Sequence, residues 1–329
     1  MILALTTGAG CNRVSGRGGD EASASPVPPA SEPPPSGGQP ASGGPIRRVS
    51  SCVLPGVPDS STFQEAKDVV FSKASGQALR LDIAWPKQGG PHKLVVLVHG
   101  GGWGDGGKSW YESEIESLAA LGYVAASVDY RLAEEQNNVF PAAVQDVRCA
   151  LRWLVASKDQ YAIEPRRVAL VGGSAGGQLA ALVASAANEE AFDGACATSG
   201  PVPPIAAVVA ISAPFDLRAS AFGGHQEGQW DVATFLGAPA RERAAQAARA
   251  SPITHIDRAD PPVLLIHGTD DATVPVSESR HYGGALAKAG VKSLLVEIAT
   301  DQHAFSPLAP EDVYRSSTCT VLEFLAKHL

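Results

Sequence analysis

The sequence predicts an α/β domain in which a mainly parallel central sheet carries helices on both faces. From about Phe63 onward, apolar runs of strand length alternate with stretches of helical periodicity, which indicates successive βα units. The run Lys93–Val98 is almost continuously apolar, as expected for a strand buried on both faces. The chain has 329 residues, of which 44% are hydrophobic, so it can bury one large core.

Two early strands, Lys67–Ser72 and Leu79–Trp85, are expected on either side of a turn at Gly76. The remaining expected strands are short apolar runs: Lys93–Val98, Tyr123–Val128, Arg167–Val171, Ile205–Ile211, Val263–Ile266 and Val291–Ile298. The expected helices have helical spacing or small helix-forming residues: Ser113–Leu121, Ala142–Ser157, Gln178–Ala187, Ala240–Ala250, Ser277–Ala289 and Glu311–His328. The stretch Phe215–Ile256 interrupts this alternation. We expect it to form a small insertion over the carboxyl edge of the sheet, where loops form ligand sites.

The N-terminal region has a different composition from the rest. Residues 1–11 combine a short apolar run with small residues and Cys11, which resembles the end of a lipoprotein signal, although no basic residue precedes the run. Residues 12–60 are rich in Gly, Ser and Pro and are expected to form a disordered linker ahead of a catalytic domain at 61–329. We expect an extracytoplasmic protein, secreted or lipid-anchored at Cys11; the alternative is a disordered N-terminus without a targeting role.

The four cysteines after Cys11 allow two disulfides in three connectivities. We favour Cys149–Cys196, which would tie a Gly- and Pro-rich insertion to a helix, and then Cys52–Cys319; four reduced thiols are the alternative. No Cys-x-x-Cys pair occurs, so a zinc site is not expected. The formal net charge of −8 argues against nucleic acid or an anionic membrane as partner. No apolar run reaches the length of a transmembrane helix.

The Gly-x-Ser-x-Gly segment at 172–176 follows the expected strand Arg167–Val171 and leads directly into a helix. This pattern is typical of a nucleophile elbow, in which Ser174 occupies a sharp strand-to-helix turn. The helix start places the Ala175 N–H where an oxyanion would form. Taken alone, the segment also fits a glycine turn or a phosphate cradle.

A second glycine-rich segment, His99-Gly100-Gly101-Gly102-Trp103, follows the strand Lys93–Val98. Glycines let the backbone approach a substrate carbonyl closely, so the N–H groups of Gly101 and Gly102 are candidate oxyanion donors together with Ala175. His99 is expected to brace this loop rather than to react. A flexible loop without a catalytic role is the alternative.

A serine nucleophile needs a base, and the base needs an acid that orients it. In hydrolases with such an elbow these residues follow in the order Ser, acid, His. The strand Val263–Ile266 ends in His267-Gly268-Thr269-Asp270-Asp271, and the spacing favours Asp271 over Asp270 as the acid. The polar loop after the last strand supplies His303 as the base.

Together these motifs resemble the α/β-hydrolase superfamily, in the carboxylesterase branch near hormone-sensitive-lipase-like and acetylxylan- or feruloyl-esterase-like enzymes. Further segments share the resemblance: Asp129-Tyr130-Arg131-Leu132, Phe140-Pro141-Ala142-Ala143, Ser251-Pro252-Ile253-Thr254 and His303-Ala304-Phe305. It implies a serine esterase that acts on short-chain acyl esters, with a small-molecule or saccharide-linked substrate and with no cofactor or metal. A prolyl-oligopeptidase-like serine peptidase and a non-catalytic binding protein of the same fold remain alternatives.

The sequence also departs from related esterases. Gly173, Gln178 and Ala304 stand where related enzymes often have an acidic residue, a histidine and a glycine, respectively. No counterpart of the N-terminal cap of hormone-sensitive-lipase-like enzymes is evident, so a more open cleft is expected. Asp129-Tyr130-Arg131 is expected to fix a strand end and a loop through an ion pair.

Overall fold

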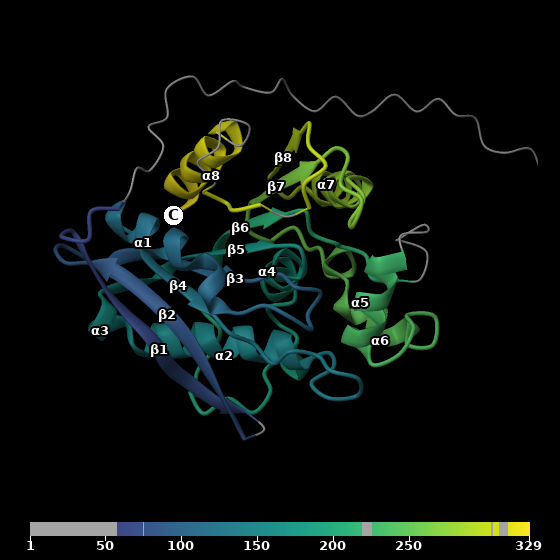
Figure 1. Ribbon diagram of the computed structural model, residues 1–329, viewed down its shortest axis with the longest axis horizontal. Coiled ribbons are helices and arrows are strands. Elements are labelled where there is room, and N and C mark those ends of the chain that lie inside the picture. Colours follow the sequence, from purple (N-terminus) through teal and green to yellow (C-terminus); the bar gives the residue numbers. More distant parts are fainter. Residues whose placement is uncertain (1–57, 75, 219–225, 304, 309–314) are drawn as a thin grey trace, which may run out of the picture. The chain divides into compact units, whose positions relative to one another are not determined.

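The computed structural model describes residues 58–74, 76–218, 226–303, 305–308 and 315–329 (Figure 1). These residues belong to one structural unit, Gly44–Leu329. The predicted signal region 1–11, with Cys11, and all but the last three residues of the predicted linker 12–60 lie outside the described residues. Within the described part of the chain, no helix has the length and apolar character needed to cross a membrane.

One eight-stranded sheet organises this part of the chain, with the order β1-β2-β4-β3-β5-β6-β7-β8. Its strands are β1 (Phe63–Ala74), β2 (Gln77–Pro86), β3 (His92–Val98), β4 (Val124–Val128), β5 (Ile163–Gly173), β6 (Ile205–Ile211), β7 (Val263–Gly268) and β8 (Ser293–Ile298). The pairs β1–β2 and β2–β4 are antiparallel and all other pairs are parallel. The parallel strands end at one edge of the sheet, which gathers the loops that follow them.

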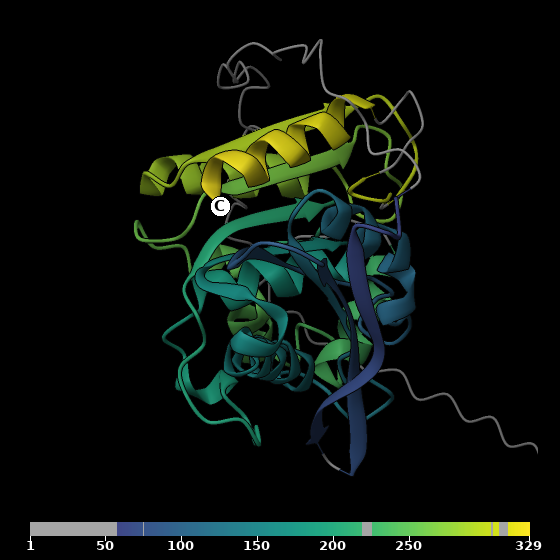
Figure 2. The same ribbon diagram turned by 90° about the vertical axis from the view of Figure 1, so that its left-hand side faces the viewer.

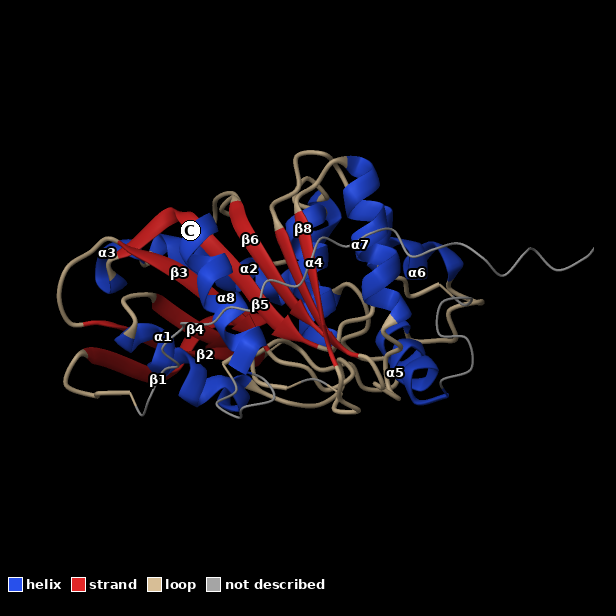
Figure 3. Ribbon diagram, turned by 90° about the horizontal axis from the view of Figure 1, so that it is seen from above, coloured by secondary structure: helices blue, strands red, loops and turns tan. Residues whose placement is uncertain are grey.

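Helices cover both faces of the sheet (Figure 3). The α-helices are α1 (Glu112–Ala120), α2 (Ala142–Ala156), α3 (Lys158–Tyr161), α4 (Ala175–Ser185), α5 (Gln226–Leu236), α6 (Ala244–Ala250), α7 (Ser277–Ala289) and α8 (Arg315–His328). Short 3-10 helices are η1 (Lys108–Tyr111), η2 (Glu190–Phe192) and η3 (Pro252–Thr254). This architecture confirms the predicted fold class.

Strand β3 shows why both faces need a cover. Leu94, Val96 and Val98 pack into an apolar cluster with side chains of α2, α4 and α7, while Val95 and Leu97 pack into a second cluster with α1 and α8. Successive side chains of a strand point to opposite faces, so an uninterrupted apolar run buries both. Figure 2 shows α8, in yellow, running along the strands near the β7–β8 edge.

The insertion between β6 and β7 differs in detail from the prediction. It contains α5, which was not anticipated, and α6 begins at Ala244 rather than at Ala240. The N–H groups of Glu242 and Arg243 bond to the carbonyl of Pro239, which makes a turn before the helix. Helix α5 buries Val232 and Phe235. Elsewhere β6 and α7 have the predicted bounds, and residues 311–314 of the predicted last helix lie outside the described residues.

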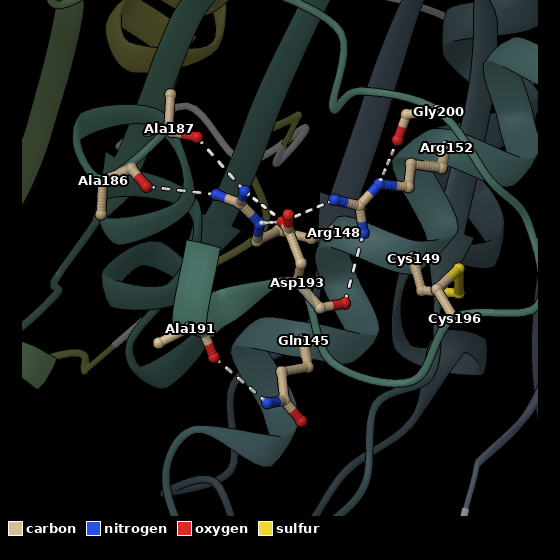
Figure 4. A network of polar contacts seen from close by, with 10 residues as sticks. All are labelled: Gln145, Arg148, Cys149, Arg152, Ala186, Ala187, Ala191, Asp193, Cys196 and Gly200. Carbon is tan, nitrogen blue, oxygen red and sulfur yellow. Dashed lines mark hydrogen bonds and ion pairs between the residues drawn. A yellow bond between two sulfur atoms is a disulfide. The ribbon is translucent and has the colours of Figure 1, made fainter. Parts of the chain in front are cut away.

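The predicted disulfide Cys149–Cys196 is present, with a Cα–Cα distance of 5.5 Å, and it joins α2 to the loop between η2 and β6 (Figure 4). The carboxylate of Asp193 lies between the guanidinium groups of Arg148 and Arg152 on the same helix. The loop is therefore fixed to α2 covalently and by charge. The second expected pairing involves Cys52, which lies outside the described residues.

Candidate active site

Ser174 occupies the turn between β5 and α4 in a strained backbone conformation, with φ 52° and ψ −125°. The glycines around it allow very close packing. A Cβ on Gly172 would lie 2.4 Å from the backbone of Gly176, and a Cβ on Gly176 would lie 2.0 Å from the carbonyl oxygen of Val98. The Gly-x-Ser-x-Gly pattern is thus a steric requirement of the turn that presents the serine.

The structure brings Ser174, His303 and Asp271 into one hydrogen-bonded row. His303 Nε2 lies 2.8 Å from Ser174 Oγ, and His303 Nδ1 lies 2.8 Å from Asp271 Oδ2. A neutral imidazole with its proton on Nδ1 satisfies both contacts, because Nδ1–H donates to the carboxylate and Nε2 accepts from the hydroxyl. In this arrangement the imidazole can take the proton of the serine.

Asp271 is held as a carboxylate. Its side chain is buried, and its Oδ1 accepts hydrogen bonds from the N–H groups of Thr273 and Val274. Burial acts to raise the pKa of Asp271, but hydrogen bonds from His267, His303 and the Val274 N–H outweigh it and hold this pKa well below its usual range. Asp270 is exposed and accepts only a bond from its neighbouring threonine among the described contacts. The geometry therefore places Asp271, and not Asp270, beside the histidine.

The buried ring of His267 lies beside the carboxylate of Asp271, a role that was not predicted from the sequence. Its ring is fully buried, with Nδ1 2.7 Å from Ser279 Oγ and Nε2 2.9 Å from the carbonyl oxygen of Val274. The same Nε2 lies 3.5 Å from Asp271 Oδ2. His267 lies in β7 four residues before Asp271, so its place in the His267-Gly268-Thr269-Asp270-Asp271 motif was the available signal.

A second unanticipated contact fixes the loop that carries His303. Ser306 Oγ donates to the carboxylate of Glu114 in α1, whose other oxygen accepts from Ser113 Oγ at 2.9 Å. Ser306 Oγ also accepts from the Leu308 N–H at 3.1 Å. Glu114 is 6% exposed, so this bridge is sheltered from water. It ties the base-carrying loop to helix α1.

Two of the candidate oxyanion donors, Gly101 and Gly102, border the same cavity as the serine. Gly101 has φ +96° and Gly102 has φ +55°, and a Cβ on Gly101 would lie 2.3 Å from the carbonyl oxygen of Asp105. Only glycine fits such a tight loop at this position. Ala175 begins α4 directly after Ser174, so its N–H is one of the unsatisfied donors of the helix start.

Trp103 and Gln178 connect this loop to the insertion. Trp103 Nε1–H donates to Gln178 Oε1 at 2.8 Å, and Gln178 Nε2–H donates to the carbonyl of Ala250 at the end of α6 at 2.6 Å. The indole also stacks on Phe235 of α5, with ring centroids 4.5 Å apart. Gln178, which replaces the histidine common in related esterases, thus acts here as a structural link.

His99 braces the glycine loop, as expected. It stacks on Tyr130 with ring centroids 4.1 Å apart, and Nδ1–H donates to the carbonyl of Gly100 at 2.8 Å. Burial lowers the pKa of His99 to about 4, so the ring is neutral at pH 7. The Tyr130 hydroxyl donates to the carbonyls of His99 and Gly100.

The residues beside Tyr130 have structural partners. Arg131 forms an ion pair with Asp146 of α2, with Nε 2.8 Å from Oδ2. Asp129 Oδ1 accepts the N–H of Lys108 at 2.9 Å, which fixes the start of η1. The expected ion pair is present after β4, but it joins Arg131 to helix α2, whereas a loop was the expected partner of the strand end.

Ser174 and His303 open into a cavity of about 750 Å³. Its described wall consists of glycines, aromatic residues, hydroxyl groups and carboxylates: Gly100, Gly101, Gly102, Asp105, Trp110, Tyr111, Glu114, Gly173, Ser174, Asp231, Thr273, His303, Phe305 and Ser306. Asp231 belongs to α5, so the insertion contributes to the site. Within the described ranges, no group of three or more histidine, cysteine or acidic side chains could hold a metal ion.

Comparison with known proteins identifies the family. Residues 81–286, well over half of the chain, match the family described as BD-FAE. The chain belongs to the BD-FAE family. This membership places it in the carboxylesterase branch of the α/β-hydrolase superfamily, as the motifs had indicated.

Individual relatives agree with this placement. The probable carboxylic ester hydrolase LipM of Mycobacterium tuberculosis is 28% identical over 259 residues, which cover 77% of this BD-FAE chain and 59% of LipM. The native structure of esterase Est2 from Thermogutta terrifontis is 26% identical, with a TM-score of 0.66 over 78% of this chain and 90% of Est2. A truncated carbohydrate esterase from gut microbiota shares the fold at 20% identity, with a TM-score of 0.69 over 82% of this chain and all of that one. The chain thus spans little more than half the length of LipM.

Proposed function

We propose that this protein is a serine carboxylesterase that hydrolyses short-chain acyl esters through Ser174, His303 and Asp271. The observation that carries the proposal is the row of two 2.8 Å contacts from Ser174 Oγ through the imidazole to Asp271. The esterase names of its relatives support the reaction class. The catalytic roles of the individual residues rest on their geometry.

In the proposed reaction, Ser174 Oγ attacks the ester carbonyl while His303 Nε2 takes the hydroxyl proton. The N–H groups of Gly101, Gly102 and Ala175 stabilise the oxyanion of the tetrahedral intermediate. When the intermediate collapses, His303 gives its proton to the departing alcohol and an acyl-serine remains.

Water then completes the reaction by the same path. His303 takes a proton from the water as its oxygen attacks the acyl carbonyl, and returns the proton to Ser174 Oγ when the carboxylic acid leaves. Asp271 keeps the imidazole in the required tautomer and stabilises its charged form. Because hydrogen bonds hold the Asp271 carboxyl ionised, it can do so throughout the catalytic cycle.

Saccharide-linked esters are the substrate class that we favour within this activity. The cavity of about 750 Å³ is large enough for an alcohol of sugar size, and Trp110 on its wall is 55% exposed. An exposed aromatic face beside hydrogen-bonding carboxylates suits a polyhydroxylated group. The carbohydrate esterase that shares the fold is consistent with this choice.

Hydrolysis of a p-nitrophenyl ester series from C2 to C12 tests the proposal. We expect activity that peaks at C2–C6 and falls by a factor on the order of 10⁴ in Ser174→Ala. A folded Ser174→Ala variant with near-wild-type turnover would refute the role of the serine. Cleavage of a proline-containing peptide in preference to esters would favour the peptidase alternative. A folded protein that hydrolyses none of these esters and does not react with a fluorophosphonate would favour the binding-protein alternative.

We also propose that the chain works outside the cytoplasm. The Cys149–Cys196 disulfide supports this proposal, because structural disulfides persist mainly in oxidising compartments. If Cys11 carries lipid, the wild-type protein will be found in the membrane fraction and Cys11→Ser will be released. An equal distribution of both proteins would contradict lipid anchoring.

A further inference from the structure

A carboxylate lies against the glycine loop that faces the candidate nucleophile. Asp231 of α5 lines the same cavity as Ser174 and His303. A Cβ on Gly102 would lie 2.7 Å from Asp231 Oδ2 and 3.0 Å from its Oδ1. The Asp231 carboxylate therefore lies in the space that a side chain at position 102 would enter.

The position of α5 over the loop is fixed by packing. Phe235, one helical turn after Asp231, stacks on Trp103 of the same loop at 4.5 Å. The N–H of Phe140 donates to the carbonyl of Phe235 at 2.7 Å. These contacts hold the end of α5 against the oxyanion loop, so the carboxylate is part of the built wall of the cavity.

Apart from the titratable His303, the ionisable side chains on the described wall of this cavity that are charged at pH 7 are acidic. Among the described residues on its wall, Asp105 and Glu114 join Asp231, and none is lysine or arginine. Asp105 Oδ1 accepts the N–H of Gly106, and Glu114 is bonded to Ser113 and Ser306. A cleft lined by one sign of charge attracts groups of the opposite sign and repels groups of the same sign.

A negative charge beside the oxyanion loop opposes the negative charge that ester cleavage develops there. A substrate that places a cation or hydrogen-bond donors near the carboxylate reduces this cost. We propose that Asp231 makes the site selective by charge: it favours esters whose alcohol carries a positive or hydroxyl-rich group and disfavours anionic esters. This inference rests on the proposed esterase function and adds a residue that determines specificity.

The expected size of the effect follows from Coulomb's law. We take a substrate charge about 6 Å from Asp231 and an effective dielectric constant of about 40. Relative to a neutral ester, a positive charge should then raise kcat/KM by about tenfold and a negative charge should lower it by about tenfold. The cationic and anionic members of a matched series should therefore differ by about 100-fold. Trp110, exposed on the same wall, can add to the preference for a cation through its ring face.

The test compares four acetate esters in buffer of low ionic strength. Acetylcholine and 3,3-dimethylbutyl acetate have nearly the same shape with and without a positive charge, 3-acetoxypropane-1-sulfonate supplies a negative charge, and glycerol monoacetate supplies hydroxyl groups. The proteins are wild type, Asp231→Asn, and Asp270→Asn as a control with the same change of net charge at an exposed site outside the cavity.

We expect wild type and Asp270→Asn to show the full cation-to-anion ratio, and Asp231→Asn to lose most of it. If wild type exceeds Asp231→Asn in kcat/KM only with glycerol monoacetate, hydroxyl donors are the partner of Asp231. If wild type exceeds Asp231→Asn with acetylcholine, the partner is a cation. The same ratio in Asp231→Asn and wild type would overturn the inference.

Two features keep the outcome clear. Turnover of neutral 3,3-dimethylbutyl acetate by wild type tests the esterase function separately from the charge preference. If Asp231→Asn does not fold, the wild-type ratio measured from about 10 mM to about 500 mM salt replaces it, because screening weakens the attraction of exposed charges. A ratio that does not change over this range would also contradict the inference.

Discussion

Removal of the Cys149–Cys196 disulfide should lower the stability of the fold by a calculable amount. The perturbation is the double variant Cys149→Ala/Cys196→Ala, which avoids a leftover thiol. The two cysteines are separated by 47 residues, so the cross-link limits the unfolded chain by a loop-closure entropy worth about 4 kcal/mol at 25 °C. For a folded domain of this size, that loss corresponds to a decrease in Tm of about 8 °C.

The folded state itself should change little. Asp193 remains paired with Arg148 and Arg152 in the double variant, so the loop stays on α2 (Figure 4). Neither cysteine lines the catalytic cavity, and ester hydrolysis at 25 °C should therefore be retained.

Guanidinium chloride unfolding followed by tryptophan fluorescence measures the difference. We expect a lower midpoint and a larger m value, since the uncrosslinked unfolded chain exposes more surface. A loss below about 1 kcal/mol would refute the argument from loop entropy. Loss of activity in a variant that remains folded would show that the loop contributes to the site.

Substitutions at three other residues test separate contacts. Asp193→Ala leaves the buried Arg148 and Arg152 without their shared carboxylate. Because Asp193 is itself partly exposed, we expect the free energy of unfolding, measured with denaturant, to fall by about 2 kcal/mol. An unchanged free energy of unfolding would contradict the pairing. The pKa of His99 falls from 6.5 to about 4 on folding, so the unfolded state binds more protons between these values and stability should decrease by about 3 kcal/mol as pH falls from 6.5 to 4. His99→Gln should flatten this dependence of stability on pH. An unchanged slope of stability against pH would show that His99 is not its source. Ser306→Ala should lower kcat for p-nitrophenyl acetate by about tenfold with little change in KM, while Ser306→Thr should retain activity; equal effects of both would point to a purely structural role.

Much of the fold could be predicted because burial leaves a local pattern. The apolar runs of β3, β6 and β7 indicated strands, and the predicted bounds Ser277–Ala289 agree with α7. The insertion was harder. Val232 and Phe235 of α5 have helical spacing, but the pattern is short and follows polar residues, so the helix gave only a weak signal.

Some residues of the candidate site could be predicted from local sequence and others could not. Ser174, Asp271 and His303 each follow a strand of the parallel sheet, so their order and positions could be read along the chain. Glu114 and Ser306 are 192 residues apart in sequence, and nothing local to either predicts their contact. The position of Asp231 against the glycine loop likewise depends on how the insertion folds back over the sheet.

We expect Asp271 to orient His303 for catalysis by Ser174, and one matched pair of variants tests this role. We would measure kcat for p-nitrophenyl acetate in Asp271→Asn and Asp270→Asn, after circular dichroism has established that both are folded. Asp271→Asn should reduce kcat by a factor on the order of 10⁴, since an amide disfavours the required imidazole tautomer, while Asp270→Asn should remain near wild type. Similar rates for the two variants, or a larger loss in Asp270→Asn, would show that Asp271 does not have this role.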